Sequence, residues 1–464
     1  MPQRGNVRAL LVNVPSYASH LRGIPLGLLY IVSSCRRPDR TLELLDGALY
    51  SRRSGFEEAL LARQFDVLGL SAITQNVDEA ARIARLVRNR RPDAKIVVGG
   101  VHASTVPLEL ADALPDCHVI AGEGEESFGL YLDAVEGKTG FENVPGLYWR
   151  DAGGLRSSPP KPIGDLDALP FPAYDLVDFP AYTVGVHGLF FKRKPLASMI
   201  TSRGCPFKCS FCAKTALTGF TWRARSPENV IEEIELLAER YGVREIHFED
   251  DNIALKPERL MAICEAIVRK RLDIAWKCPH GIYAGGLDHD MFRLMRRSGC
   301  YSLSFGVESG SDELLRRAGK TQDTASLRKT IESAHTAGIQ CIGFFIFGLE
   351  GETPETIRQT VDFAKSLPLD AAQFNLCVPF KGTPIRERYL ELGYVAGEDF
   401  ASYDVDHAVV NLPGLSAAEL KKHRLRAFAE FYARPSIMLR NLRNISSLDV
   451  LRALLYRLRN IWRA

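Results

Sequence analysis

The sequence predicts an α/β protein with two parallel sheets in separate domains and a helical C-terminal tail. Short β-branched runs alternate with amphipathic stretches of helical length on both sides of a proline-rich segment. Strands that alternate with helices in this way form parallel sheets through βαβ units. The length of 464 residues also exceeds one ordinary core and favours two or three domains.

Residues 1–136 are predicted to form the first sheet, in a doubly wound, Rossmann-like domain of the flavodoxin type. The expected strands are residues 9–14, 41–45, 67–71, 96–99 and 117–120. Ligands of such sheets bind at the carboxyl ends of the strands. The loops after the last three strands are rich in glycine and small polar residues, so a bulky ligand approached closely by backbone is expected there.

Residues 137–197 contain eight prolines and are predicted to form an extended linker. Proline removes a backbone donor and restricts the residue before it, which disfavours helices in this segment. Leu147–Arg150 and the residues after it are expected to form a small hairpin.

Residues 198–395 are predicted to form a partial (β/α)6 barrel. Strand-like runs alternate with helical stretches, and Pro227, Pro257 and Pro354 stand where three of the helices begin. The expected strands are residues 198–202, 245–249, 274–277, 301–306, 341–347 and 372–378. Catalytic groups of parallel barrels lie at the carboxyl ends of the strands, so the active site is expected there.

Three cysteines, Cys205, Cys209 and Cys212, lie in one loop directly after the first barrel strand. Three thiolates within eight residues can converge on one inorganic centre and leave a coordination position free, whereas a structural zinc site needs four ligands. A zinc site completed by a distant Cys or His is the alternative. A disulfide framework is disfavoured because the other seven cysteines are scattered through apolar segments.

The CxxxCxxC spacing, with Phe211 before the last cysteine, resembles the cluster loop of radical S-adenosylmethionine (SAM) enzymes. The resemblance implies that Cys205, Cys209 and Cys212 hold a 4Fe–4S cluster whose open iron chelates the amino and carboxylate groups of SAM. It also implies SAM contacts at three further strand ends. Alternatively, each carboxylate at these ends is a solvated loop residue or a helix N-cap. The SAM-contact candidates are Phe211, Asp250, Asp251, Glu308, Ser309, Gly343 and Ile346.

The first domain resembles the cobalamin-binding domain. Its family pattern is matched by Ser71-Ala-Ile73 and by Gly99-Gly100, but the aspartate expected two residues before His20 is Ala18. His20 is therefore either the lower cobalt ligand or a loop histidine without that role, and the sheet could instead bind another ligand. The cobalamin candidates are His20, Ser71, Thr74, Gly99, Gly100, His102, Gly122 and Glu123.

Cys377 lies at the end of the sixth predicted barrel strand. Its thiol could face the substrate as a hydrogen donor or a transient ligand. The alternative is a small core residue, which is the commoner role of a free cysteine.

Residues 396–464 are predicted to form a helical tail. Leucines and Trp462 recur at helical spacing from near Ser447, and residues 434–463 hold seven arginines against one aspartate. Such a stripe packs against its own protein or, alternatively, makes peripheral contact with a membrane surface or an anionic partner.

Composition and charge narrow the class of protein. Apolar residues make up 46% of the chain, charged residues 25%, and the net charge is +3. No apolar run reaches the ~18–20 residues that span a bilayer, and the N-terminus lacks the apolar core of a signal peptide. We expect a cytoplasmic monomer that binds no nucleic acid, in a compartment where thiols stay reduced.

The resemblance implies a cobalamin-dependent radical SAM enzyme with a 4Fe–4S cluster, SAM and cobalamin as cofactors. A methyltransferase that alkylates an unactivated carbon, or phosphorus, of a small molecule is the leading hypothesis. Rearrangement, cyclisation or aminocarboxypropyl transfer is an alternative, because relatives with those activities share these parts. A non-enzymatic metal- or cobalamin-binding sensor is the alternative from another class. The expected partners are a small-molecule substrate and a reductase or flavodoxin-type electron donor.

Overall fold

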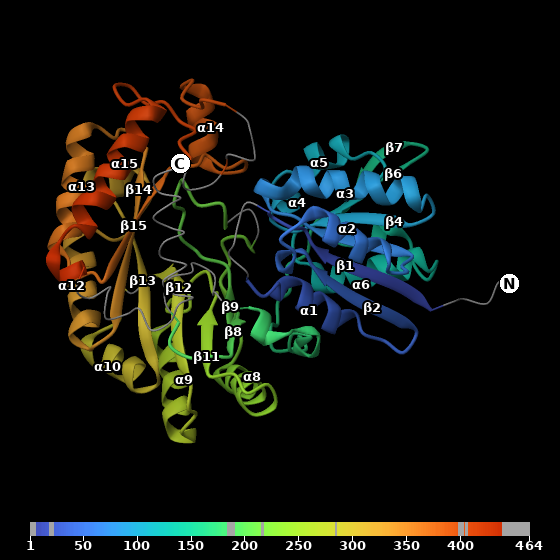
Figure 1. Cartoon of the computed structure of the whole chain (residues 1–464), viewed down its shortest axis with the longest axis horizontal. Coiled ribbons are helices and arrows are strands. Elements are labelled where there is room, and N and C mark those ends of the chain that lie inside the picture. The colour runs from blue at the N-terminus through green and yellow to red at the C-terminus, as the bar shows by residue number, and fades with distance from the viewer. Residues whose placement is uncertain are drawn as a thin grey trace. The chain divides into compact units, whose positions relative to one another are not determined.

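The computed structural model describes residues 6–17, 23–182, 191–214, 218–283, 285–397, 403 and 407–438. The chain divides into two compact units, the first of which contains the predicted doubly wound domain and the second the predicted barrel. Each unit is coloured by its place along the chain in Figure 1.

The first unit is built on a seven-stranded sheet in the order β2-β1-β3-β4-β5-β6-β7 (Figure 1). Its first five strands pair in parallel, as the sequence predicts, because a helical crossover joins each of them to the next. They are β1 (Val7–Asn13), β2 (Arg40–Asp46), β3 (Val67–Ser71), β4 (Lys95–Gly99) and β5 (His118–Ile120). The helices are α1 (Leu26–Cys35), α2 (Arg53–Leu61), α3 (Val77–Arg90), α4 (Val101–Thr105), α5 (Pro107–Ala113) and α6 (Gly124–Val135).

The expected hairpin after residue 147 is present, and it belongs to this sheet. Strands β6 (Leu147–Asp151) and β7 (Gly154–Ser157) pair with each other in antiparallel fashion, and β6 also pairs with β5. The predicted boundary at residue 136 is therefore too early. Proline content alone could not reveal that β5 leaves an open sheet edge to which a hairpin adds.

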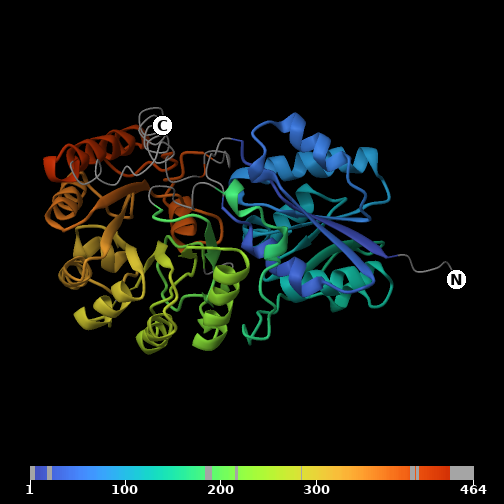
Figure 2. The same ribbon diagram turned by 60° about the horizontal axis from the view of Figure 1, so that its bottom comes forward.

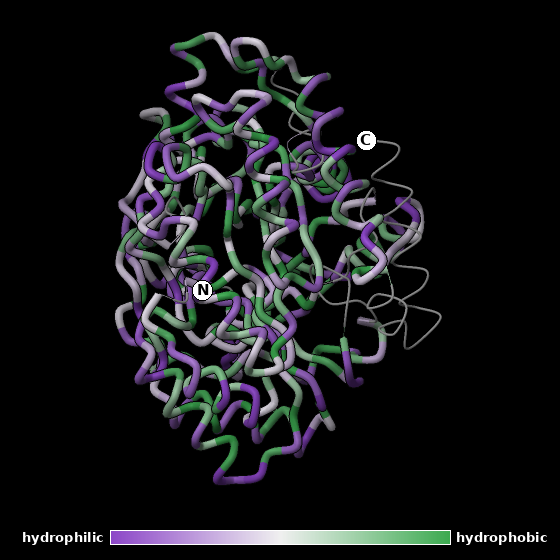
Figure 3. The backbone as a smooth tube through the Cα atoms, turned by 90° about the vertical axis from the view of Figure 1, so that its left-hand side faces the viewer, coloured by the Kyte–Doolittle hydropathy of each residue, from purple (hydrophilic) through white to green (hydrophobic). Residues whose placement is uncertain are grey.

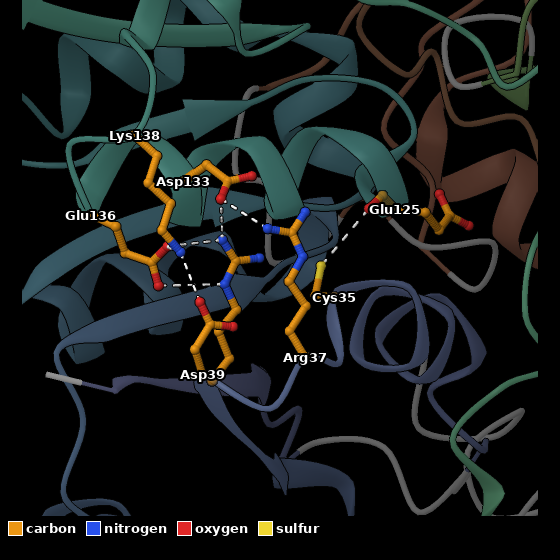
Figure 4. A network of polar contacts seen from close by, with 8 residues as sticks. Cys35, Arg37, Asp39, Glu125, Asp133, Glu136 and Lys138 are labelled. Carbon is orange, nitrogen blue, oxygen red and sulfur yellow. Dashed lines mark hydrogen bonds and ion pairs between the residues drawn. The ribbon is translucent and has the colours of Figure 1, made fainter. Parts of the chain in front are cut away.

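An ion-pair network joins the start of β2 to the end of α6 (Figure 4). The side chain of Arg40 is fully buried, and its Nη2 lies 2.8 Å from Asp133 Oδ1 and 3.2 Å from Glu136 Oε2. Lys138 reaches Glu136 and Asp39 at 2.7 and 2.8 Å. This network lies at the amino ends of the strands, opposite the edge where ligands of such sheets bind.

The second unit contains a six-stranded, all-parallel sheet in the order β15-β14-β13-β12-β11-β8. The predicted six βα units are thus confirmed. The strands are β8 (Leu196–Met199), β11 (Glu245–Phe248), β12 (Ala275–Ile282), β13 (Cys300–Glu308), β14 (Gln340–Phe347) and β15 (Ala371–Leu376). Two short strands, β9 (Ser202–Arg203) and β10 (Arg223–Ala224), pair beside them.

Helices cover the outer side of this curved sheet (Figure 2). Pro227, Pro257 and Pro354 occupy the first turn of three of them, as predicted. The helices are α8 (Pro227–Arg240), α9 (Pro257–Lys270), α10 (His289–Arg297), α11 (Asp312–Arg317), α12 (Thr324–Thr336), α13 (Pro354–Ser366), α14 (Pro384–Glu391) and α15 (Ala417–Tyr432). The backbone tube alternates between polar and apolar residues within single helices, as helices with one buried face do (Figure 3).

Burial along the strands separates the inner face of the barrel from the face that packs on helices. In β14, Ile342, Phe344 and Ile346 are partly exposed, while the residues between them are buried. Trp276 of β12 donates to the Ser298 carbonyl at the end of α10, which places its side chain on the helix side. Because side chains alternate along a strand, the neighbours of Trp276 point into the barrel.

Only the beginning of the predicted helical tail falls within the described residues. Helix α15 packs on β15, where Arg424 donates to the Phe374 carbonyl at 2.8 Å. The predicted amphipathic helix from Ser447 and its basic face lie outside the described residues. In the part of the chain that the structure describes, no helix is both long and apolar enough to cross a bilayer.

Candidate functional site

The three cysteines lie in the loop between β9 and β10, at the carboxyl end of the first barrel strand. Cys205, Cys209 and Cys212 are partly exposed and form no disulfide, whereas the other seven cysteines are buried. Burial raises the pKa of the three thiols, to about 11 for Cys209. The three loop cysteines therefore differ from the seven buried cysteines in solvent exposure as well as in spacing.

The three thiols lie close to one another in this loop, as the ligands of one iron–sulfur cluster must. Cys205 and Cys212 lie close enough to Cys209 for each to raise the pKa of its thiol. Among the described residues, however, no three His, Cys, Asp or Glu side chains converge tightly enough for one metal ion. A four-iron cluster takes one thiolate per iron, so its ligands stand further apart than those of a zinc ion.

Asp250 anchors the base of the cysteine loop. Its carboxylate is buried and accepts hydrogen bonds from the Thr201 amide at 3.1 Å, the Thr201 hydroxyl at 2.7 Å and the Ser202 hydroxyl at 2.6 Å. Burial raises the pKa of Asp250, and these donors together with Arg259 oppose that effect. Its oxygens are thus engaged within the protein, which favours a positioning role over direct SAM contact.

Asp251 connects the two ends of the same loop. Its Oδ2 accepts from the Gly204 amide at 2.9 Å, and its Oδ1 lies 3.0 Å from Lys214 Nζ. Gly204 precedes Cys205, and Lys214 follows Cys212. Asp250 and Asp251 were equal candidates from the sequence, and in the structure both accept hydrogen bonds from residues that flank the cysteines.

Two segments from later in the chain hold the middle of the loop. The Ser210 amide donates to the Ala318 carbonyl at 2.9 Å, and the Ser210 carbonyl accepts from the Ile385 amide at 3.0 Å. Gly319 has a φ of +75°, and a Cβ on it would stand 2.6 Å from the Lys208 carbonyl oxygen. A side chain there would displace the loop, so glycine is required.

Glu308 ends β13 beside this contact, with a φ of +64° that is rare for a residue with a side chain. Burial raises its pKa, and Lys320 opposes the shift from 3.3 Å away. Ser309 is fully buried, and its hydroxyl lies 3.2 Å from the Thr360 hydroxyl on α13. The structure thus places Glu308 near the cysteine loop and uses Ser309 for packing against a helix.

The candidates for the adenine support divide between the two faces of β14. Ile346 is partly exposed on the inner face. Gly343 is buried on the helix side, where an added Cβ would meet Leu369 at 2.7 Å and Phe345 at 2.9 Å. Gly343 is therefore required for packing, and Ile346 is the residue that can touch a ligand. Phe211 is half-buried within the cysteine loop.

A polar group inside the barrel was not predicted from the sequence. Glu249, at the end of β11, forms an ion pair with His280 of β12 and accepts from the Ser198 hydroxyl at 3.1 Å. Glu249 directly precedes the candidates Asp250 and Asp251, but its pairing with His280 depends on the register of β11 with β12. His280 carried no signal, because a single histidine after a proline has no distinctive spacing.

A second polar group lies deeper in the barrel. Glu245 accepts from the Tyr301 hydroxyl at 2.6 Å and lies 2.7 Å from His247 Nε2, and all three residues are buried. The register of β12 with β13 shifts between Trp276 and Lys277, so Tyr301 is an extra residue on β13. Such a bulge turns a side chain to a new direction. Barrel interiors are commonly filled with branched apolar residues, so these groups are unusual.

Cys377 is 2% exposed, and burial raises the pKa of its thiol far above the ordinary range. Its amide donates to the Phe347 carbonyl at 2.7 Å, and its Cβ lies against Gly348. This environment is that of a small core residue and does not support the proposed role in hydrogen donation.

The first unit gathers most cobalamin candidates at the carboxyl edge of β3, β4 and β5. Thr74 follows β3, and its hydroxyl lies 3.2 Å from Nδ1 of the buried His102 in α4. Gly100 has a φ of +95°, and a Cβ there would stand 2.7 Å from the Ala72 carbonyl oxygen. Ser71 and Gly99 end β3 and β4 as a registered pair. Backbone crowding between the two loops therefore explains Gly100 even without a ligand.

The loop after β5 is tied to its neighbours. The Gly122 amide donates to the Ser104 hydroxyl at 2.9 Å, and this hydroxyl donates to the Gly100 carbonyl at 2.9 Å. Glu123 accepts from the Ile163 amide at 2.6 Å, which fixes the proline-rich segment to this edge. His20 lies outside the described residues.

Comparison with known proteins agrees with this division. The family model described as the B12 binding domain matches residues 18–132, and the one described as the radical SAM superfamily matches residues 199–364. The chain is 30% identical over 446 residues to an uncharacterized methyltransferase of Pyrococcus horikoshii, covering 94% of this chain and 95% of the relative.

Two further similarities are more distant. The chain is 28% identical over 395 residues to the cytidylyl-2-hydroxyethylphosphonate methyltransferase of Streptomyces wedmorensis, covering 75% of this chain and 71% of the relative. Among solved structures, the radical S-adenosylmethionine methyltransferase TsrM of Kitasatospora setae, with cobalamin and a 4Fe–4S cluster bound, has a TM-score of 0.72. It covers 93% of this chain and 90% of that chain at 20% identity, which shows a shared fold.

Proposed function

This chain belongs to the family of cobalamin-dependent radical SAM methyltransferases, and from that premise we propose that it methylates an unactivated carbon, or alternatively a phosphorus, of a small molecule. The observation that carries the proposal is the loop of three accessible, reduced cysteines at the carboxyl end of β8. The cofactors of this family are a 4Fe–4S cluster, SAM and cobalamin.

In this proposal each group of site residues has its own role. Cys205, Cys209 and Cys212 hold the cluster, while Asp250 and Asp251 keep their loop in place. When bound, the cluster supplies the electron that cleaves SAM, and cobalamin supplies the methyl group. Ile346 on the inner face of β14 supports the adenine ring, and Glu308 accepts from ribose hydroxyls.

The loops of the first unit form the proposed cobalamin site. Thr74 and His102 contribute side chains to this site. Its backbone approaches the cofactor closely at Ser71, Gly99, Gly100 and Gly122. Barrel closure would exclude water and oxygen from a reactive intermediate. The proposed setting is the cytoplasm, with an electron supplied by a reductase or flavodoxin-type protein.

A labelling experiment tests the reaction. The full chain is reconstituted anaerobically with iron, sulfide and hydroxocobalamin, then incubated with SAM carrying a deuterated methyl group, a chemical reductant and a small-molecule extract of the source cells. Mass spectrometry follows 5′-deoxyadenosine, S-adenosylhomocysteine and any metabolite that gains the deuterated methyl group. Cys209→Ser is the matched control, because it removes one proposed cluster ligand.

Each outcome decides between reaction classes. A deuterated product together with both nucleosides supports methyl transfer, and phosphorus coupling in its NMR spectrum separates phosphorus from carbon. A changed metabolite without the label, accompanied by 5′-deoxyadenosine, assigns rearrangement or cyclisation and overturns the proposal. Iron-free protein that releases no nucleoside overturns radical SAM chemistry for this chain.

A further inference from the structure

Lys320 is a mostly buried cation at the carboxyl end of the barrel. Its Nζ lies 2.8 Å from the Gly306 carbonyl oxygen and 3.3 Å from Glu308 Oε1, and 15% of its side chain is exposed. A carbonyl and a carboxyl oxygen thus fix the ammonium group in place. A lysine held in this way is a stationary charge and not a mobile surface residue.

The turn that carries Lys320 packs directly on the cysteine loop. The Ala318 carbonyl accepts from the Ser210 amide at 2.9 Å. A Cβ on Gly319 would stand 3.6 Å from the Cys209 Cα as well as 2.6 Å from the Lys208 carbonyl oxygen. The backbone immediately before Lys320 therefore lies so close to the cysteine loop that residue 319 has no room for a side chain.

Lys320 directly follows Gly319, so its ammonium group is a positive charge held beside the loop that carries Cys209. Glu308 is the counter-charge of Lys320, and its Oε1 lies 3.3 Å from the lysine Nζ. On the other side of the loop, Lys214 is paired with Asp251.

We propose that Lys320 sets the reduction potential of the cluster held by Cys205, Cys209 and Cys212, and that Glu308 moderates its effect. This rests on the proposed function, because it requires that the cysteines hold a 4Fe–4S cluster. Reduction adds one electron from an external donor to the cluster and therefore one negative charge beside Lys320. A fixed cation in a low-dielectric setting stabilises that added charge, and net charge near the sulfurs is among the factors that set cluster potentials.

The test is a redox titration of the reconstituted full chain without SAM, followed by electron paramagnetic resonance of the reduced cluster. Leaving SAM out removes any change caused by altered SAM binding. Lys320→Met should lower the midpoint, with about a tenfold smaller ratio of reduced to oxidised cluster at a given potential, equivalent to 59 mV for a one-electron couple. Lys320→Arg should keep the wild-type midpoint, and Glu308→Gln should not lower it.

The matched control is Lys208→Met, which removes an exposed lysine from the cysteine loop itself. Solvent screens an exposed charge, so its removal should leave the midpoint within the error of the titration. If Lys320→Met and Lys208→Met both keep the wild-type midpoint, Lys320 does not tune the cluster.

The outcomes separate this inference from the proposed function. Wild-type protein that binds no cluster overturns the proposed function itself. Wild-type protein with a reducible cluster and an unchanged midpoint in Lys320→Met overturns only the role of Lys320. If Lys320→Met loses its iron while Lys320→Arg retains it, Lys320 serves cluster retention, and the tuning role is again overturned.

Discussion

Replacing Asp250 with alanine should loosen the base of the cysteine loop. The buried carboxylate is the acceptor for the Thr201 amide, the Thr201 hydroxyl and the Ser202 hydroxyl. Without it, three buried donors lose their partner, at about 1 kcal/mol or more each. The local opening free energy should therefore fall by about 3 kcal/mol, which corresponds to roughly a 100-fold loss of protection from exchange.

Hydrogen–deuterium exchange with peptide mass spectrometry measures this effect where it occurs. Peptides that cover residues 199–205 should exchange about 100-fold faster in Asp250→Ala, while peptides from β14 should be unchanged. Asp250→Asn should lose an intermediate amount of protection from exchange. Its amide oxygen can still accept one hydrogen bond, but its NH2 group would face the donors of Thr201 and Ser202. Asp290→Ala is the control, because that side chain is 89% exposed on α10.

Iron binding follows from the same geometry. If the loop base opens more often, the three cysteines spend less time in position, so iron per chain after anaerobic reconstitution should fall in Asp250→Ala. Wild-type protection at residues 199–205 in Asp250→Ala would refute the reasoning, since it would mean that these hydrogen bonds do not hold the loop.

Three further predictions concern stability and the role of a cysteine. Arg40→Met leaves Asp133 and Glu136 without their buried partner and should lower the free energy of unfolding by about 3 kcal/mol, measured by urea denaturation. Burial lowers the pKa of His118 to about 4, so wild-type protein should lose stability as the pH falls from about 6.5 towards 4. His118→Gln should lose less stability over that range. The measurement is the drop in the urea midpoint between pH 7.5 and pH 5, and an equal drop in wild type and His118→Gln would contradict this prediction. Cys377→Ala should keep reductive SAM cleavage, measured as 5′-deoxyadenosine, because the thiol is a core residue; a loss of cleavage would return Cys377 to the active site.

The features that sequence could predict are those encoded locally. Alternation of strands and helices predicts the parallel strands of both sheets, and proline at the first helical turn places α8, α9 and α13. The cysteine loop is equally local, since its three ligands lie within eight residues. Strand ends on the same edge then follow from the parallel topology.

The features that sequence could not predict depend on register and on contacts between distant segments. Glu249 meets His280 only because β11 and β12 lie side by side, and Tyr301 faces Glu245 because β13 carries a bulge. Lys320 approaches the cysteine loop through a turn with no periodic pattern.

Resemblance to family motifs also could not show which of several neighbouring residues touch a ligand and which only position others. Asp250, Ser309 and Gly343 stand in motif positions, but their contacts are with protein. Ile346 alternates with buried neighbours on β14 and so faces the interior. Burial and hydrogen-bond partners, which require the fold, separate positioning residues from those free to touch a ligand.

The most direct test of the central claim compares wild type with the Cys205→Ser, Cys209→Ser, Cys212→Ser triple variant. Both are reconstituted anaerobically, and iron per chain is measured together with 5′-deoxyadenosine released from SAM under reductant. Wild type should bind about four irons and release the nucleoside, while the variant should do neither. A variant that keeps wild-type iron and nucleoside release would contradict the assignment of the cluster to these three thiols.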